Sequence, residues 1–225
     1  MYQFVTGPLA WLSFGVFFIG CFLRGVQYIR GLNWQADRVA YSVHLQHGIK
    51  GALRSIFFWL IPFGTKSWRA NLRFTVIFFV FHISLIVTPI FLQAHNIILK
   101  ERWGFGFWTI SDATADVLTM VMIAAAGFIV LRRLALPEVR ILTTAYDYLV
   151  LLITVAPFIT GFLTYHQVQN PHFWVIVHIL SGEFMLMAIP FTKLSHFVLF
   201  FMSRAQLGMD YGIKRGGMKG KGLAW

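Results

Sequence analysis

Charged side chains are scarce in this chain. Asp, Glu, Lys and Arg make up 12% of its 225 residues, which is about half their usual share in a soluble domain. Hydrophobic residues make up 58%, more than a single water-soluble core of this size can hide. These proportions exclude the disordered, collagen-like and disulfide-stapled classes, and they predict an integral membrane protein.

Cysteine is almost absent, since Cys21 is the only one. A single thiol excludes a disulfide within the chain and exchange chemistry between paired thiols. The sequence also has no Cys-x-x-Cys-His motif, so covalent attachment of a c-type haem at such a motif is excluded as well.

Five long apolar stretches are present, and each is long enough to cross a hydrocarbon core about 30 Å thick as a helix of about 20 residues. The alternating ten-residue pattern of a membrane β-barrel does not appear. We therefore predict an all-α integral membrane protein, a bundle of five transmembrane helices within a domain of residues 1–205. The predicted spans are 8–29, 74–99, 113–131, 148–165 and 173–202.

Lysine and arginine lie mostly on one side of the predicted spans. Residues 24–73 carry eight of them, 132–140 carry three, and the chain from Lys193 onward carries six. The opposite side has only Lys100 and Arg102. The positive-inside rule then places the N-terminus outside and the C-terminus in the cytoplasm, as in a multi-pass protein of the bacterial inner membrane. We interpret the formal charge of +11 as a topology signal and expect no nucleic acid as partner.

Two segments on the predicted cytoplasmic side do not span the membrane. Residues 39–63 are semi-apolar and contain cations, so we predict an amphipathic helix in the interface, with His44 and His47 as its polar residues rather than ligands. The tail, residues 206–225, is basic and rich in glycine, and it is expected to stay flexible until lipid or a partner orders it. The stretch 38–73 and the tail are candidate docking surfaces, with attraction to lipid headgroups as the alternative.

Four histidines lie inside predicted spans, where an ionisable side chain is costly and is a functional candidate by default. His82 and His95 belong to the second span, and His178 and His196 belong to the fifth. An odd number of crossings makes these two spans antiparallel. His82 is then expected to be level with His196 near the cytoplasmic side, and His95 with His178 near the outer side.

Two facing pairs of imidazoles at different depths are what two stacked haems with bis-histidine ligation require. The fifth-span histidines are 18 residues apart, which puts them on one helical face about 27 Å apart. Those of the second span are 13 residues apart and differ by roughly 140° on an ideal helix. A kink or bulge at Pro89 is therefore needed to bring them to a common face.

Two other interpretations of the four histidines are weighed against haem. Zinc is disfavoured, because only two nitrogens converge at each level and a structural zinc site takes four ligands. The other alternative is that these are buried histidines hydrogen-bonded across helices, without any metal.

Two motifs resemble a known family. Residues 178–196, HILSGEFMLMAIPFTKLSH, are similar to the last ligand helix of the respiratory nitrate reductase gamma subunit, a five-helix di-haem cytochrome b. Residues 131–147, LRRLALPEVRILTTAYD, resemble the cytoplasmic loop of that family. The second-span sequence FHISLIVTPIFLQAHNIIL, residues 81–99, looks more like the cytochrome b subunits of sulfate-reducer transmembrane complexes that contain a tetrahaem cytochrome c.

The resemblance implies two haem b groups and a place in a respiratory redox complex, here one of sulfate respiration. Electrons are expected to pass from menaquinol or a periplasmic multihaem cytochrome c, through the outer and then the inner haem, to a cytoplasmic iron–sulfur subunit. The chain shows no nucleophile, phosphate-binding loop or carboxylate pair of its own, so its expected role is that of an electron-transfer subunit of an oxidoreductase. The rival interpretation is a haem-free membrane transporter or assembly factor that uses the histidines for protons or metal.

Other polar residues are assigned roles from their predicted depth. Asp112, Asp116, Tyr165 and His166 are candidates for a menaquinone site at the outer side. Asp112 is also a candidate N-cap of the third helix, which is the simpler role. Glu183 is either a proton relay that influences the haem or a neutral side chain hydrogen-bonded to a neighbouring helix, and we favour the second.

Haem propionates are anionic and need cationic partners. Lys193, Arg132 and Arg133 are the candidates on the cytoplasmic side, and Arg102 is the candidate on the outer side. The alternative for each of them is an anchor that reaches the lipid headgroups.

Overall fold

The computed structural model describes residues 2–32 and 44–214 of the chain. Within these ranges the structure is helical, and the only β pairing is an isolated bridge between Leu92 and Ile110. Five helices are long and apolar enough to cross a membrane, which confirms the all-α membrane class and the expected number of spans. They are Tyr2–Gly31, Leu72–Phe91, Asp112–Ala135, Ala145–Tyr165 and Pro171–Phe191. The predicted insert from 39 to 43 and the predicted tail from 215 to 225 lie outside the described residues.

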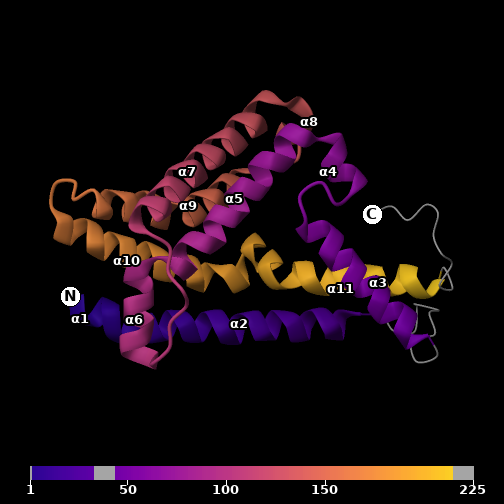
Figure 1. The fold of residues 1–225 in the computed structure, drawn as a ribbon, viewed down its shortest axis with the longest axis horizontal. Helices are drawn as coiled ribbons and strands as arrows, with labels where there is room; N and C mark the ends of the chain where they lie inside the picture. The colour runs from indigo at the N-terminus through magenta and orange to yellow at the C-terminus, as the bar shows by residue number, and fades with distance from the viewer. Residues whose placement is uncertain (1, 33–43, 215–225) are drawn as a thin grey trace. The chain divides into compact units, whose positions relative to one another are not determined.

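The second predicted span is wrong as a single helix. It consists of α5 (Leu72–Phe91) and α6 (Gln93–Trp103), which are separated by Leu92 in an extended conformation with φ −62° and ψ 132°. Figure 1 shows α6 leaving the end of α5 at a sharp angle. Pro89 lies in the last turn of α5, where it lacks the backbone N–H that would continue the hydrogen-bond ladder.

The fifth predicted span is also interrupted. Helix α10 (Pro171–Ala188) is followed by two short 3₁₀ turns, Ile189–Phe191 and Lys193–Ser195, and then by α11 (His196–Lys214). His178 and His196 therefore do not share one continuous helix, and the predicted five-turn spacing between them is wrong. The first residues of the predicted tail, 206–214, are helical because α11 continues through them.

The chain divides into two compact units. Unit 1 contains Met1–Trp11 and Val76–Met185, and unit 2 contains Leu12–Thr75 and Leu186–Trp225. At the N-terminus, α1 (Tyr2–Phe4) and a π-helical turn (Val5–Leu9) lead into α2 (Ala10–Gly31).

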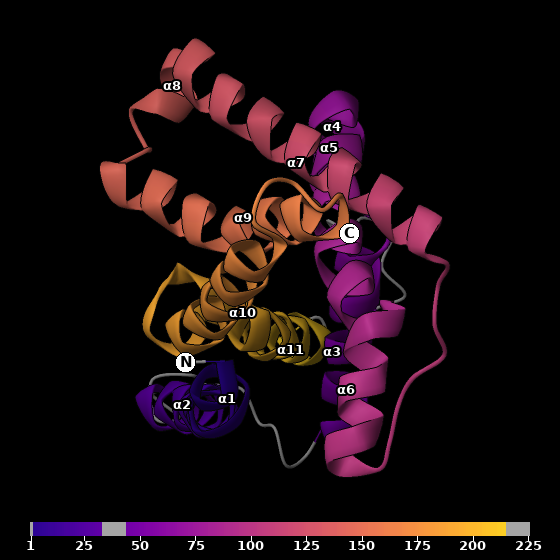
Figure 2. The same ribbon diagram turned by 90° about the vertical axis from the view of Figure 1, so that its left-hand side faces the viewer.

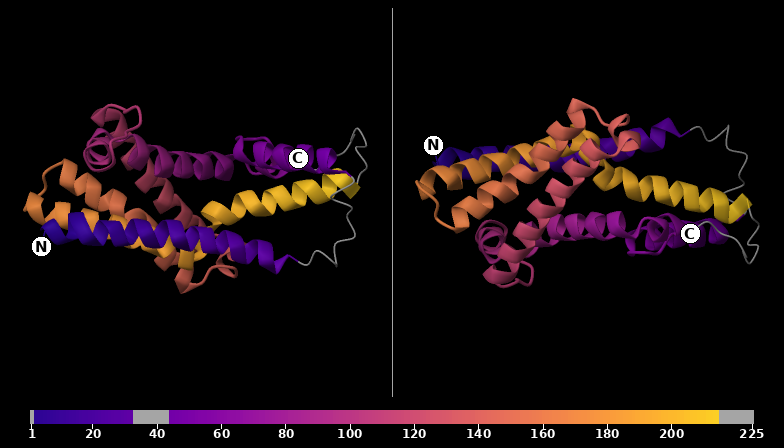
Figure 3. Two further views of the ribbon diagram at one scale, coloured as in Figure 1. Left: turned by 90° about the horizontal axis from the view of Figure 1, so that it is seen from below. Right: turned by 90° about the horizontal axis from the view of Figure 1, so that it is seen from above.

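Unit 1 is built around the packing of α5 with α7 (Asp112–Ala135) and α9 (Ala145–Tyr165). Its core contains Phe81 of α5, the completely buried Met122 of α7 and Phe158 of α9. Alanines at 125 and 126 let the backbone of α7 approach its neighbours closely. The short helix α8 (Pro137–Arg140) connects α7 to α9, and Figure 3 shows α9 and α10 as a hairpin.

Helices α7 and α9 of unit 1 are capped by side chains at their starts. Ser111 is the N-cap of α7, and its hydroxyl accepts a hydrogen bond from the Thr114 N–H at 3.2 Å. The interpretation of Asp112 as the N-cap is therefore wrong, because Asp112 is the first residue inside the helix. Thr144 and Asp147 form a reciprocal capping box at the start of α9.

In unit 2, α11 runs along α2 (Figure 1). The rings of Phe17 and Phe197 have centroids 6.1 Å apart, and the Tyr28 hydroxyl donates to Gln206 Oε1 at 2.5 Å. Between the two helices an apolar cavity of about 470 Å³ is lined by residues that include Cys21 and Met202. The first turn after α10 also packs on α2, because the Arg24 Nε donates to the Pro190 carbonyl at 2.8 Å.

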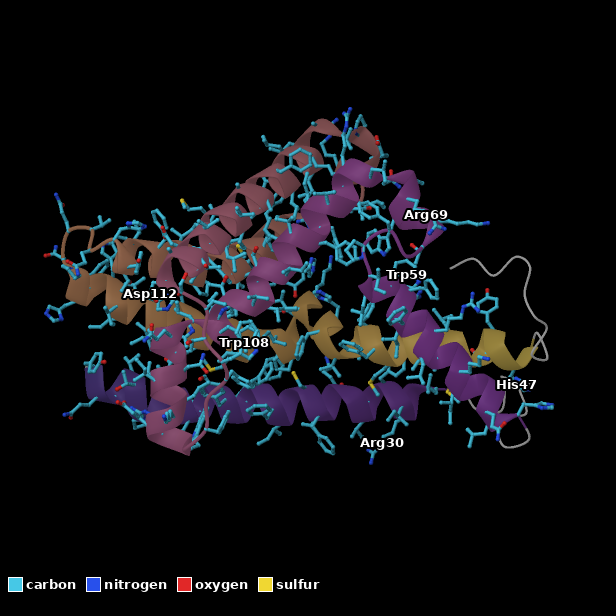
Figure 4. The ribbon with its side chains drawn as sticks, in the orientation of Figure 1. Arg30, His47, Trp59, Arg69, Trp108 and Asp112 are labelled. Atoms are coloured by element: carbon cyan, nitrogen blue, oxygen red, sulfur yellow. The ribbon has the colours of Figure 1, made fainter. Side chains whose placement is uncertain are left out.

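The other helices of unit 2 are α3 (Leu45–Leu60) and α4 (Lys66–Ala70). A helix does form in the predicted amphipathic segment, and α3 packs closely on α11 through small residues. A side chain at Gly51, Gly208 or Gly212 would overlap the backbone of the facing helix. The apolar face of α3 that turns away from α11 is exposed, as at Leu53. Figure 4 labels His47 and Trp59 toward its two ends.

Candidate functional site

The interruption between α5 and α6 determines where His95 lies. Because α6 begins anew at Gln93, its azimuth is independent of the azimuth of α5, and the angle of roughly 140° expected for one ideal helix no longer applies. The Nδ1 of His95 donates to the Pro89 carbonyl at 2.8 Å. Pro89 was expected to change the direction of the helix, and its carbonyl also accepts the hydrogen bond from His95.

His178 lies on α10 and is held by α9. Its Nδ1 donates to the Pro157 carbonyl at 2.9 Å and lies 3.4 Å from the Thr160 hydroxyl oxygen. Gly161 makes room for the ring, since a Cβ at this position would lie 3.0 Å from the Cε1 and 3.1 Å from the Nδ1 of His178. The imidazole therefore lies directly against the backbone of α9.

The structure brings His95 and His178 together within unit 1. Their ring centroids are 6.0 Å apart and their planes differ by 14°. Each ring is half-buried and uses its Nδ1 hydrogen to bind a carbonyl of a helix. This tautomer leaves the lone pair on Nε2, the nitrogen that is then available to a metal.

The spacing of the two rings would allow His95 and His178 to hold one metal ion between them. A metal–imidazole bond is about 2 Å long, and a ring centroid lies about 1 Å beyond the bonded nitrogen, so two imidazoles on opposite sides of one iron have centroids about 6 Å apart. The nearly parallel planes agree with the same arrangement. A haem iron needs only these two protein ligands, and among the described residues no three His, Cys, Asp or Glu side chains converge. The donor set therefore fits haem iron better than structural zinc.

His82 and His196 have the same local pattern. His82 Nδ1 donates to the Phe78 carbonyl at 2.8 Å, and its ring lies 4.1 Å from the Phe78 ring. His196 Nδ1 donates to the Lys193 carbonyl at 2.9 Å. In both, the lone pair is again on Nε2. His82 belongs to unit 1 and His196 belongs to unit 2, so their predicted pairing stays a prediction.

Where α9 ends beside the start of α7, two of the predicted quinone-site residues meet. His166 Nε2 lies 3.0 Å from Asp116 Oδ1, joining the end of α9 to α7. The ring of His166 also packs at the edge of the Tyr165 ring, with centroids 5.1 Å apart. Asp112, labelled in Figure 4, is exposed in the first turn of α7 and has no hydrogen bond to this pair in the described structure. Three of the four predicted residues are thus adjacent.

The predicted propionate partners have different surroundings. Arg133 donates to the Asp147 carbonyl at 3.1 Å and lies 5.9 Å from the Tyr148 ring centroid, so it ties α7 to α9. Arg132 is half-buried near the end of α7. Lys193 and Arg102 are exposed at the start of a 3₁₀ turn and in the last turn of α6. The structure therefore gives Arg133 a structural task and leaves the roles of the other three as predictions.

Glu183 of α10 is the one buried acidic residue of the described chain, with 6% of its surface exposed. Neither carboxyl oxygen has a hydrogen-bond partner among the described residues. The favoured interpretation, a neutral carboxyl hydrogen-bonded to a neighbouring helix, is therefore wrong in its second half.

Sequence reasoning missed the residues that hold the two histidines. Pro157 supplies a carbonyl from another helix, Gly161 supplies space, and Asn96 binds the backbone at the end of α5. The sequence offered no signal for these contacts, because a proline removes the donor for the carbonyl four residues before it and not for its own.

Comparison with known proteins identifies a relative of this chain but assigns no activity. The chain is 53% identical over 226 residues to a protein of Nitratidesulfovibrio vulgaris strain Hildenborough, and the alignment covers all of both chains. The name of that relative, "Protein", assigns it no function. No family model matches the chain.

Proposed function

The chain belongs to the family of that Nitratidesulfovibrio vulgaris protein, and we propose that it is a di-haem b membrane subunit of a respiratory redox complex. One observation carries the proposal: His95 and His178 present nearly parallel imidazoles 6.0 Å apart. Both rings are oriented by carbonyls of interrupted or proline-containing helices. A pair held in this way would hold a metal ion through two imidazole nitrogens.

The second haem is assigned to His82 and His196. In each of them Nδ1 donates to a backbone carbonyl, as it does in the first pair. The order of the spans in the sequence and the positive-inside rule predict that these histidines lie toward the cytoplasmic side. Haem iron supplies reversible one-electron chemistry, while the chain sets its ligation, spacing and surroundings.

Two haems at different depths give electrons a path across the membrane. The proposed donor on the outer side is menaquinol or a periplasmic multihaem cytochrome c, and the proposed acceptor is a cytoplasmic iron–sulfur subunit. Asp116 and His166, already 3.0 Å apart, are suited to receive protons when a quinol is oxidised near the outer pair. Arg102 on the outer side and Lys193 and Arg132 on the cytoplasmic side are the proposed cations for the propionates.

The proposal is tested by counting haems in the purified protein and in single variants. A pyridine haemochrome assay is expected to give two haem b per chain. His95→Ala and His178→Ala should each lose one haem, and they should lose the same one in the reduced-minus-oxidised spectrum. His172→Ala is the matched control, because His172 is an exposed outer-side histidine that should leave both haems in place.

The contrary results are equally clear. Two haems retained in both His95→Ala and His178→Ala would show that this pair does not ligate. A folded wild-type protein without haem would refute the proposal and favour the haem-free transporter, for which the unpaired carboxyl of Glu183 would then be the first residue to test.

A further inference from the structure

The end of α5 has three carbonyls that the interrupted helix leaves without regular partners. Each finds a donor of a different kind. The Pro89 carbonyl accepts from His95 Nδ1 at 2.8 Å, and the Phe91 carbonyl accepts from the Ile110 N–H at 3.0 Å. The Ile90 carbonyl between them accepts from the side-chain amide of Asn96, Nδ2, at 2.7 Å.

Asn96 makes more contacts than this one. Its Nδ2 also donates to the Leu92 carbonyl at 3.0 Å, and its Oδ1 accepts from the Phe107 N–H at 2.7 Å. The side chain is 5% exposed. One buried amide therefore joins the end of α5, the first turn of α6 and the loop that returns beside α6 to the start of α7 (Figure 2).

Helix α6 depends on such contacts for its direction. It has 11 residues, fewer than the roughly 12–15 that an isolated helix needs even in a favourable sequence. It has no side-chain cap at its start. The loop that covers it is held by Asn96 and by the packing of Phe91 on Trp108, whose rings lie 4.3 Å apart (Figure 4).

We propose that Asn96 is a positioning residue for the metal ligand beside it: by tying α6 to the end of α5, it sets the plane of the His95 ring relative to His178. The inference rests on the proposed function, because it treats His95 as a ligand. Without the Asn96 amide, the Ile90 carbonyl loses the hydrogen bond from Nδ2, and α6 turns until water or another donor reaches that carbonyl. His95 is adjacent to Asn96 on the same short helix, so the His95 ring turns with the helix.

Two substitutions distinguish the hydrogen bonds that the Asn96 amide donates from the one that it accepts. Asn96→Ala removes all three hydrogen bonds. Asn96→Asp, studied at a pH that ionises the new carboxyl, keeps an oxygen that can accept from the Phe107 N–H, but it then has no hydrogen to give to the Ile90 and Leu92 carbonyls. Gln93→Ala is the control, because Gln93 is an exposed amide side chain at the start of the same helix.

The readouts are haem content, low-temperature electron paramagnetic resonance and hydrogen exchange of the peptide that contains Phe107. We expect both Asn96 variants to shift the signal of the haem that His95→Ala removes, toward the form typical of ligand planes turned away from parallel. The signal of the other haem should not move. Protection of the Phe107 amide should be lost in Asn96→Ala, retained in Asn96→Asp and unchanged in Gln93→Ala.

Three results would overturn the inference. The first is a folded Asn96→Asp protein whose haem signals equal those of the wild type. The hydrogen bond from Asn96 to the Ile90 carbonyl of α5 would then not influence His95. The second is an equal shift in Gln93→Ala. The third is loss of both haems together in every Asn96 variant, which would indicate a general structural role. A wild-type protein without haem would instead refute the proposed function, while the exchange of the Phe107 amide would still test the hydrogen bond itself.

Discussion

Replacing Gly161 by alanine tests whether the His178 ring is held where α9 puts it. The new Cβ would lie 3.0 Å from the ring carbon Cε1 and 3.1 Å from Nδ1, closer than ordinary van der Waals contact. The ring cannot retreat freely, because its Nδ1 is bonded to the Pro157 carbonyl at 2.9 Å. We therefore expect the imidazole to move by a few tenths of an ångström and its hydrogen bond to lengthen.

Two opposing terms set the magnitude of this change. Alanine in a helix interior is favoured over glycine by about 1 kcal/mol, whereas extra volume in a packed site costs roughly 1–3 kcal/mol. The free energy of unfolding should therefore fall by about 0–2 kcal/mol. The larger effect is expected at the haem proposed for His95 and His178, which should show a shifted signal or lower occupancy in Gly161→Ala and should be lost in Gly161→Val.

Gly182→Ala provides the matched control, because this helical glycine of α10 has nothing within 4 Å of the position of the new Cβ. It should raise the free energy of unfolding by up to about 1 kcal/mol and leave both haem spectra unchanged. Thermal unfolding in detergent and the optical spectrum measure both effects. If Gly161→Ala is as stable as the control and its outer haem is unaltered, the position assigned to the His178 ring is wrong.

Three further predictions concern other parts of the molecule. Glu183→Gln should change the free energy of unfolding by less than about 0.5 kcal/mol, and Glu183→Leu should raise it by roughly 1–3 kcal/mol, because the carboxyl has no partner to lose; a marked loss of stability in Glu183→Gln, measured by thermal unfolding, would contradict this. Gly208→Val should destabilise the packing of α3 on α11 by roughly 3 kcal/mol, because the side chain meets the backbone of α3. Faster hydrogen exchange in α3 would report it, and Gly15→Ala, with nothing within 4 Å, should not have this effect. Asp116→Asn and His166→Ala should slow haem reduction by menaquinol roughly 100-fold while reduction by dithionite is unchanged; equal menaquinol rates in wild type and variants would remove this pair from the quinone site.

The sequence was sufficient to predict the helices but not their interruptions. Long apolar stretches determine where a helix must be, because every backbone group in lipid needs a partner within the segment. The same rule does not say whether a proline kinks a helix or ends it. The helix ends two residues after Pro89, because Asn96 and Ile110 supply donors to the freed carbonyls. Those donors come from the following segments, so no periodicity in residues 74–99 reveals them.

The candidate site was also predictable only in part, because some of its contacts come from other segments of the chain. Antiparallel order and depth were enough to expect His95 opposite His178, and the structure brings their rings to 6.0 Å. The orientation of each ring was not predictable, since it depends on a carbonyl at Pro157 in another helix and on the missing side chain at Gly161. The partner of Glu183 was expected from the cost of burying a carboxyl, but the described structure supplies none.

The same proline-to-histidine spacing occurs at both interruptions, between α5 and α6 and between α10 and α11. Pro89 precedes His95 by six residues, and Pro190 precedes His196 by six residues. In each case a polar side chain binds a carbonyl freed at the interruption: Asn96 at Ile90 and Arg24 at Pro190. A continuous helix fixes the angle between two ligands by the number of residues between them, whereas a helix that restarts lets each ligand take the direction its own surroundings require. His82 and His95 are 13 residues apart, which would not put them on one face of a single helix. Because they lie on two separate helices, α5 and α6, this spacing does not restrict their directions.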